Sequence, residues 1–79
     1  MATPEEIADE QRKMRKLRII VDLTAAILYQ GEHSQVEAFS IIAAAKKSVL
    51  ELFPDKAETF DLIYKPRFER IIKERLQSN

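Results

Sequence analysis

The chain has 79 residues, with no cysteine, one glycine and three prolines. This length allows one small domain over residues 1–79, because chains divide into several cores only at a few times this size. Apolar residues make up 46% of the chain and charged residues 33%, a composition that excludes a disordered chain. Thirteen basic residues balance thirteen acidic ones, so no net charge attracts nucleic acid or anionic lipid.

The missing residue types exclude most catalytic chemistry. Without cysteine there is no disulfide, no thiolate nucleophile and none of the common zinc sites. His33 is the only imidazole, and we expect it in a solvent-exposed loop. The longest apolar run, residues 41–45, is too short to span a bilayer, and no basic segment followed by an apolar run marks a signal peptide. The sequence therefore predicts a cytoplasmic protein that is not an enzyme and has no cofactor, metal, membrane or small-molecule substrate.

The first predicted helix begins at Thr3-Pro4-Glu5-Glu6. Thr3 can accept a hydrogen bond from the amide of Glu6, and proline at the first helical position loses no intrahelical bond. The helix can continue to Gln30, because Gly31 suits the left-handed conformation that ends helices. We expect a helix over residues 4–30. Residues 1–11 should overhang the rest of the domain or fray.

Two further capping patterns predict two further helices. Ser34-Gln35-Val36-Glu37 predicts a helix over residues 35–52, which Phe53-Pro54 ends. Asp55-Lys56-Ala57-Glu58 has the same form and predicts a helix over residues 56–76. We see no strand pattern and no internal repeat.

Pro66 interrupts the third predicted helix. Its ring removes a backbone donor and presses on the carbonyl of Leu62, so we expect a kink, or else a break that leaves two short helices. The connections are short enough to place neighbouring helices antiparallel. The sequence therefore predicts an all-α fold, a three-helix up-down-up bundle with a long first helix and a kink or break in the third helix at Pro66.

Each predicted helix has an apolar stripe that we assign to the core. On the first helix this core stripe contains Met14, Leu17, Val21, Thr24 and Leu28. On the second helix it contains Val36, Phe39, Ala43, Leu50 and Phe53, continued by Ile42 and Val49. The third helix contributes Phe60, Ile63, Tyr64, Phe68, Ile71 and Ile72.

The chain has more apolar side chains than these stripes need. It contains twenty-seven Ile, Leu, Val, Met, Phe and Tyr residues, whereas three helices with one seam each use about twenty. A contiguous second face usually marks association. We predict a protein-interaction module, most simply a homodimer, although a monomer with scattered exposed residues and a different protein partner stay open. The expected interface residues are Ile19, Leu23, Ala26, Ile27, Ile41, Ala45 and Leu52.

A basic cluster on the first helix provides the alternative function. It consists of Arg12, Lys13, Arg15, Lys16 and Arg18, and a concentrated positive helix can bind a phosphate backbone. Nearby acids explain the cluster without a ligand: Asp9, Glu10, Glu51, Asp55, Glu58 and Asp61.

A single lysine also lies inside the expected core stripe of the second helix. Lys46 falls among apolar positions there, where a buried charge is costly. We expect its stem to pack and its ammonium to reach solvent or the neighbourhood of Glu51. A buried ion pair or an interface lysine is the other possibility.

Overall fold

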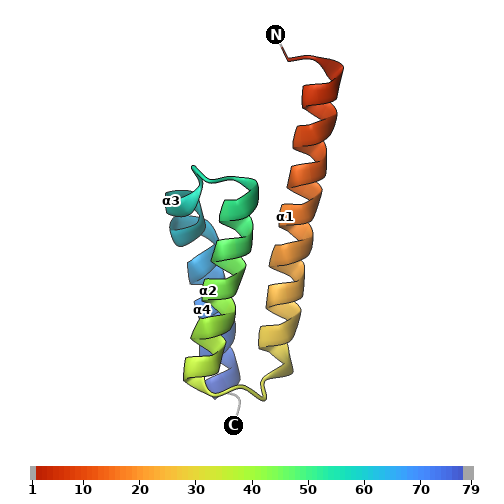
Figure 1. Cartoon of the computed structure of the whole chain (residues 1–79). Helices are drawn as coiled ribbons and strands as arrows, with labels where there is room; N and C mark the ends of the chain where they lie inside the picture. The colour runs from red at the N-terminus through yellow and green to blue at the C-terminus, as the bar shows by residue number, and fades with distance from the viewer. Residues whose placement is uncertain (1, 78–79) are drawn as a thin grey trace.

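The structure is a computed structural model that describes residues 2–77, and its regular elements are all helical. They are α1 (Pro4–Gln30), α2 (Gln35–Leu52), α3 (Ala57–Thr59), the π-helical turn η1 (Phe60–Tyr64) and α4 (Lys65–Gln77). Figure 1 shows α2 returning beside α1, while α3, η1 and α4 follow one another and run back alongside α2. The predicted all-α bundle of three helices is therefore confirmed, with α3, η1 and α4 as its third helix.

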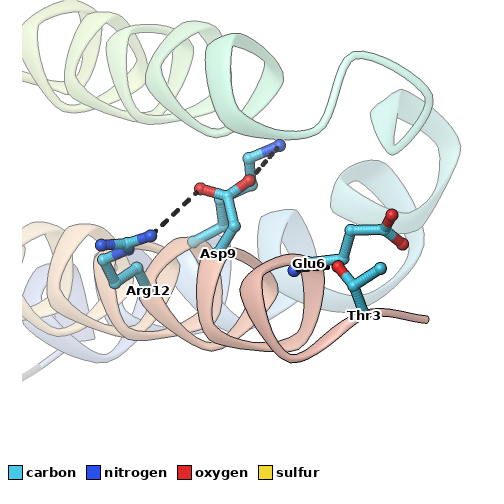
Figure 2. Close-up of polar contacts among 5 residues, drawn as sticks. Thr3, Glu6, Asp9 and Arg12 are labelled. Atoms are coloured by element: carbon cyan, nitrogen blue, oxygen red, sulfur yellow. Dashed lines mark hydrogen bonds and ion pairs between the residues drawn. The ribbon is translucent and has the colours of Figure 1, made fainter.

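Local sequence signals explain both ends of α1. The Thr3 hydroxyl accepts a hydrogen bond of 3.1 Å from the Glu6 amide, as Figure 2 shows, and Pro4 is the first helical residue. At the other end Gly31 has a φ of 71°, the left-handed conformation that glycine adopts without steric cost. A Cβ at Gly31 would also collide with the Arg75 guanidinium of α4.

The start of α2 is a complete capping box. The Ser34 hydroxyl accepts from the Glu37 amide at 3.1 Å, and the Glu37 carboxylate accepts from the Ser34 amide at 3.3 Å. Hydrogen bonding by the Ser34 side chain, and then by its backbone, holds the pKa of Glu37 below its ordinary value. At the end of α2, the Phe53 amide donates to the Val49 carbonyl at 2.8 Å.

The expected third capping box is wrong. Pro54 and Asp55 lie in a turn that the Lys56 amide closes by donating to the Phe53 carbonyl at 3.0 Å. This turn places Asp55 before the capping position, which Lys56 occupies without a side-chain hydrogen bond. The helix therefore begins at Ala57 with an uncapped first turn.

Helical residues continue through Pro66, and the irregularity lies before it in η1. The Lys65 amide donates to the Phe60 carbonyl, five residues back instead of four. This longer turn accommodates the donor that Pro66 lacks and the crowding of its ring, because a π turn moves the hydrogen-bonding register by one residue. The predicted two-helix alternative is wrong for the described chain, in which α4 starts directly after η1.

The π turn also aligns the largest core side chains. Phe60 and Phe68 are eight residues apart, so in a regular α-helix they would differ by about 80° around the axis. The π turn rotates less per residue, and both rings are almost fully buried, with centroids 6.2 Å apart. The buried apolar core consists of Leu17, Val21, Leu28, Ala38, Ile42, Ala45, Val49, Phe60, Phe68, Ile71 and Ile72.

The expected core stripe is correct on α1 from Leu17 onward but only partly correct on α2, where Ile42 and Val49 are buried and Phe53 packs against the core as expected. Val36, Phe39 and Ala43 are exposed, and Leu50 is half-buried. The face that packs against the other helices is instead the one with Ala38, Ile42, Ala45 and Val49. Its small alanines let the neighbouring helices approach closely, whereas the stripe with Phe39 would hold them apart. Two other expected core residues, Met14 and Ile63, are about half exposed.

The first turns of α1 extend past the bundle, as Figure 1 shows. Every residue from 2 to 12 is exposed, and Met14 is level with the end of α2, since it shares a surface cavity with Phe53 and Lys56. We call residues 4–12 the α1 arm. The expected overhang is therefore present, and it is helical from Pro4.

Candidate interaction surface

The most distinctive surface of the molecule is an exposed apolar stripe on α1. It consists of Ile19, Leu23, Ala26 and Ile27, which we call the α1 face; all four are exposed, Leu23 by 58%. Placed at about 100° per residue, they occupy a sector of about 100° beside the buried stripe of Leu17, Val21, Thr24 and Leu28. α1 therefore has two apolar stripes, and the bundle covers only one of them.

The α1 face lies on the side of α1 that is turned away from the bundle, with Ile27 at the edge nearest to the partly buried Ile20. Arg18 and Asp22, on the opposite flank of the buried stripe, share a surface cavity with Tyr64 and Arg67, so that flank faces η1 and α4. The remaining flank, which includes the partly buried Ile20, is therefore turned toward α2. Ile41 of α2 is also partly buried against the core.

The three interface residues predicted on α2 differ in how much of each side chain is exposed. Ile41 and Leu52 are both partly buried, which leaves some of each side chain available. Ala45 is only 5% exposed and belongs to the core, so its assignment to a surface is wrong. The reason is that α2 packs against the other helices through the face with Ala38 and Ala45, not through the expected face with Phe39.

Other apolar side chains are exposed where the sequence did not predict it. On α2 these are Val36 and Phe39, and on η1 they are Leu62 and Ile63. One signal in the sequence pointed to the α2 error, because Lys46 lies in the middle of the stripe that was assigned to the core. A lysine at that position favours a half-exposed face, which is where the structure places it.

Lys46 forms an ion pair with Asp61 of η1. Its Nζ donates to the Asp61 carboxylate at 2.9 and 3.0 Å, and both side chains are partly exposed. The Lys46 side chain is thus partly exposed, as expected, and it lines a surface cavity together with Glu51. Its ammonium also connects α2 to the π turn. An ion pair with this exposure contributes about 0.2–1 kcal/mol and positions the two helices more than it stabilises them.

The basic cluster does not form one continuous face. Arg12, Lys13, Arg15, Lys16 and Arg18 are spread over more than half of the helix circumference. Asp9 lies 3.8 Å from the Arg12 guanidinium and 3.7 Å from the Lys13 ammonium, as Figure 2 shows for Arg12. Within residues 2–77 the ion pairs of this cluster are these two, both on exposed side chains, and Asp61 pairs with Lys46 instead.

The end of the bundle at the α1–α2 connection contains a small cavity with polar residues. His33 lies in the connecting loop, as expected, but is half-buried instead of exposed, and its Nε2 donates to the Ile27 carbonyl at 3.1 Å. Arg75 of α4 donates to the Gln30 carbonyl at 3.4 Å. Both side chains thus satisfy carbonyls at the end of α1, which carries no basic residue in its own last turn.

Comparison of the chain with protein-family models, curated proteins and solved structures gave no match. In residues 2–77 no group of three or more His, Cys, Asp or Glu side chains is placed to hold a metal ion. Among the helices of the described chain, none is both long and apolar enough to cross a membrane. The α1 face is therefore the feature from which a function can be argued.

Proposed function

We propose that this protein is a protein-interaction module that self-associates through the α1 face, with Ile41 and Leu52 of α2 at its margin. The observation that carries the proposal is the second apolar stripe of α1, which folding of the single chain leaves exposed. Single exposed leucines are normal, but a stripe of branched apolar side chains on consecutive turns usually marks an interface. No catalytic role is proposed, and the cytoplasmic location stays a prediction.

A second copy of the chain is the partner that needs the fewest assumptions. Most oligomers of soluble proteins are symmetric pairs that use the same patch on both subunits. The α1 face suits such a contact, because it is a straight stripe on one rigid helix that spans about two turns from Ile19 to Ile27. Burying it would remove three large side chains from water on each copy, and each fully buried side chain is worth about 1.5–3 kcal/mol.

The test compares the native mass of two matched leucine variants by light scattering. Leu23→Asp introduces a charge in the centre of the α1 face, and Leu62→Asp introduces the same charge at a leucine of η1 that is somewhat more exposed. We expect the wild type and Leu62→Asp to have about twice the 9.2 kDa chain mass, and Leu23→Asp to be a folded monomer. A folded Leu23→Asp variant with the mass of the wild type would overturn the proposal.

Salt separates this proposal from nucleic-acid binding by the basic cluster. An apolar interface weakens little with added salt, whereas phosphate binding falls steeply. Loss of nucleic-acid binding in a Lys13→Glu, Lys16→Glu variant that keeps its native mass would support the alternative function. The dispersed arrangement of these side chains around α1 gives that alternative no single binding face.

A further inference from the structure

We propose that the second copy binds antiparallel, with a two-fold axis passing near Leu23, and that charges at the two ends of the α1 face select this direction. The inference rests on the proposed function and adds the orientation of the partner and the residues that set it. In this arrangement Leu23 faces Leu23 of the second copy, and Ile19 faces Ile27 of the second copy, because position i lies opposite position 46 − i. The apolar stripe is then complementary to itself.

The α1 face has a basic end. Arg12 and Lys16 precede Ile19 by two turns and one turn, and all three lie in the same sector of the helix as Leu23 and Ile27. Within the described chain, Arg12 has one ion pair, the long, exposed contact to Asp9. Lys16 is exposed, and among residues 2–77 no carboxylate lies within ion-pair distance of it. Lys16 is therefore a positive charge that remains available at the edge of an apolar stripe.

The opposite end of the α1 face is acidic. Glu32 follows Gly31 directly at the end of α1 and is exposed. Glu37 lies one turn before Ile41 on the first turn of α2, where its carboxylate is held in the capping box. Arg75 and His33 already bind the carbonyls at the end of α1, so the negative charge of this end rests on the two carboxylates. One end of the surface is thus positive and the other negative.

This polarity discriminates between the two possible directions of pairing. In the antiparallel arrangement, the last residue of α1 in the second copy, Gln30, lies at the level of Lys16, and Glu32 follows two residues later, so each basic end meets an acidic end. In a parallel arrangement, Lys16 would face Lys16 and Arg12 would face Arg12, and like charges beside an interface are unfavourable. The two-fold axis repeats the favourable contact, so each interface contains it twice.

Cross-linking of single-cysteine variants tests the orientation, since the natural chain contains no cysteine. Chains with Ile19→Cys are mixed with chains with Ile27→Cys that carry a mass tag, and the mixture is oxidised. A disulfide requires Cβ atoms about 3.5–4.5 Å apart, so only residues that face each other react efficiently. We expect mixed 19–27 cross-links to predominate, and Leu23→Cys alone to form a homodimer.

The outcomes separate this inference from the proposed function. Predominant 19–19 and 27–27 products would overturn the antiparallel arrangement and leave self-association through the α1 face in place. A native mass of one chain for the unmodified protein would overturn both. A dimeric mass without cross-links at positions 19, 23 or 27 would show that another surface is used, and would overturn both as well.

A charge exchange tests the role of the ends. We expect Lys16→Glu to weaken the dimer about threefold to tenfold, because two exposed contacts are lost together. Adding Glu32→Lys to the same chain restores the opposite charges and should recover most of the affinity. Equal weakening in the double variant would contradict the assignment of Lys16 and Glu32 to facing ends, since a general loss of helix stability cannot be rescued by a second charge reversal.

Discussion

The two halves of α1 have different reasons to be helical. In the α1 arm, every residue is exposed, and the helix depends on the Thr3 cap, on Pro4 and on weak contacts such as those of Asp9. From Leu17 onward, α1 buries a stripe against α2 and α4, and tertiary packing stabilises it. The packed half also carries the α1 face, which neither helix formation nor the bundle core requires. The proposed self-association rests on this second apolar stripe.

The largest expected effect separates the two stripes of the packed half. Leu28 is 3% exposed on the buried stripe, and Leu28→Ala should lower the free energy of unfolding by about 2–5 kcal/mol. Leu23→Ala on the α1 face should change it by no more than about 0.5 kcal/mol once the protein is diluted to a monomer. Urea unfolding at low protein concentration measures both. Equal midpoints for Leu28→Ala and the wild type would contradict the assignment of the core.

A smaller effect separates the caps of the two regions. Ser34→Ala should lower the global free energy of unfolding by about 1 kcal/mol, because it removes the acceptor for the Glu37 amide at the start of a packed helix. Thr3→Ala removes the same kind of bond from the α1 arm, which can unfold while the bundle stays intact. We expect Thr3→Ala to speed amide hydrogen exchange in the arm only. An equal loss of global stability in both variants would mean that the arm and the bundle unfold together.

The smallest expected effect is that of removing the arm. A chain that starts at residue 12 should keep its free energy of unfolding to within about 0.5 kcal/mol, because residues 2–11 bury nothing against the bundle. Urea unfolding of the shortened and full-length chains measures the difference. A loss of several kcal/mol would show that the arm packs in solution, and would remove the distinction between the two halves of α1.

Signals that act within a few residues were readable from the sequence. Thr3, Ser34 and Gly31 each satisfy backbone groups on their own turn, so their identity predicts where α1 and α2 begin and where α1 ends. Asp55 shows the limit of such signals, because a turn at Pro54 competes with the cap and shifts the helix start. Pro66 marked the place of an irregularity, but a kink, a break and a π turn all relieve the same crowding.

Periodicity alone could not predict which side of α2 packs into the core. Apolar residues surround most of this helix, so several faces satisfy a helical wheel equally well. Packing decides between them, and it favours the face with Ala38 and Ala45, which permits close approach, over the face with Phe39. The exposed apolar residues of α1 were easier to predict, because α1 has a polar sector that limits which sides of the helix can be apolar. Four of the seven expected interface residues lie there and are exposed: Ile19, Leu23, Ala26 and Ile27.

The most direct test of self-association through the α1 face is the native mass of the unmodified chain, measured by light scattering over a wide dilution series at low and high salt. We predict about twice the 9.2 kDa chain mass at high concentration, a fall toward the monomer on dilution, and only a small change with salt. A mass of one chain at every concentration would contradict the account, and the second apolar stripe of α1 would then require a different partner.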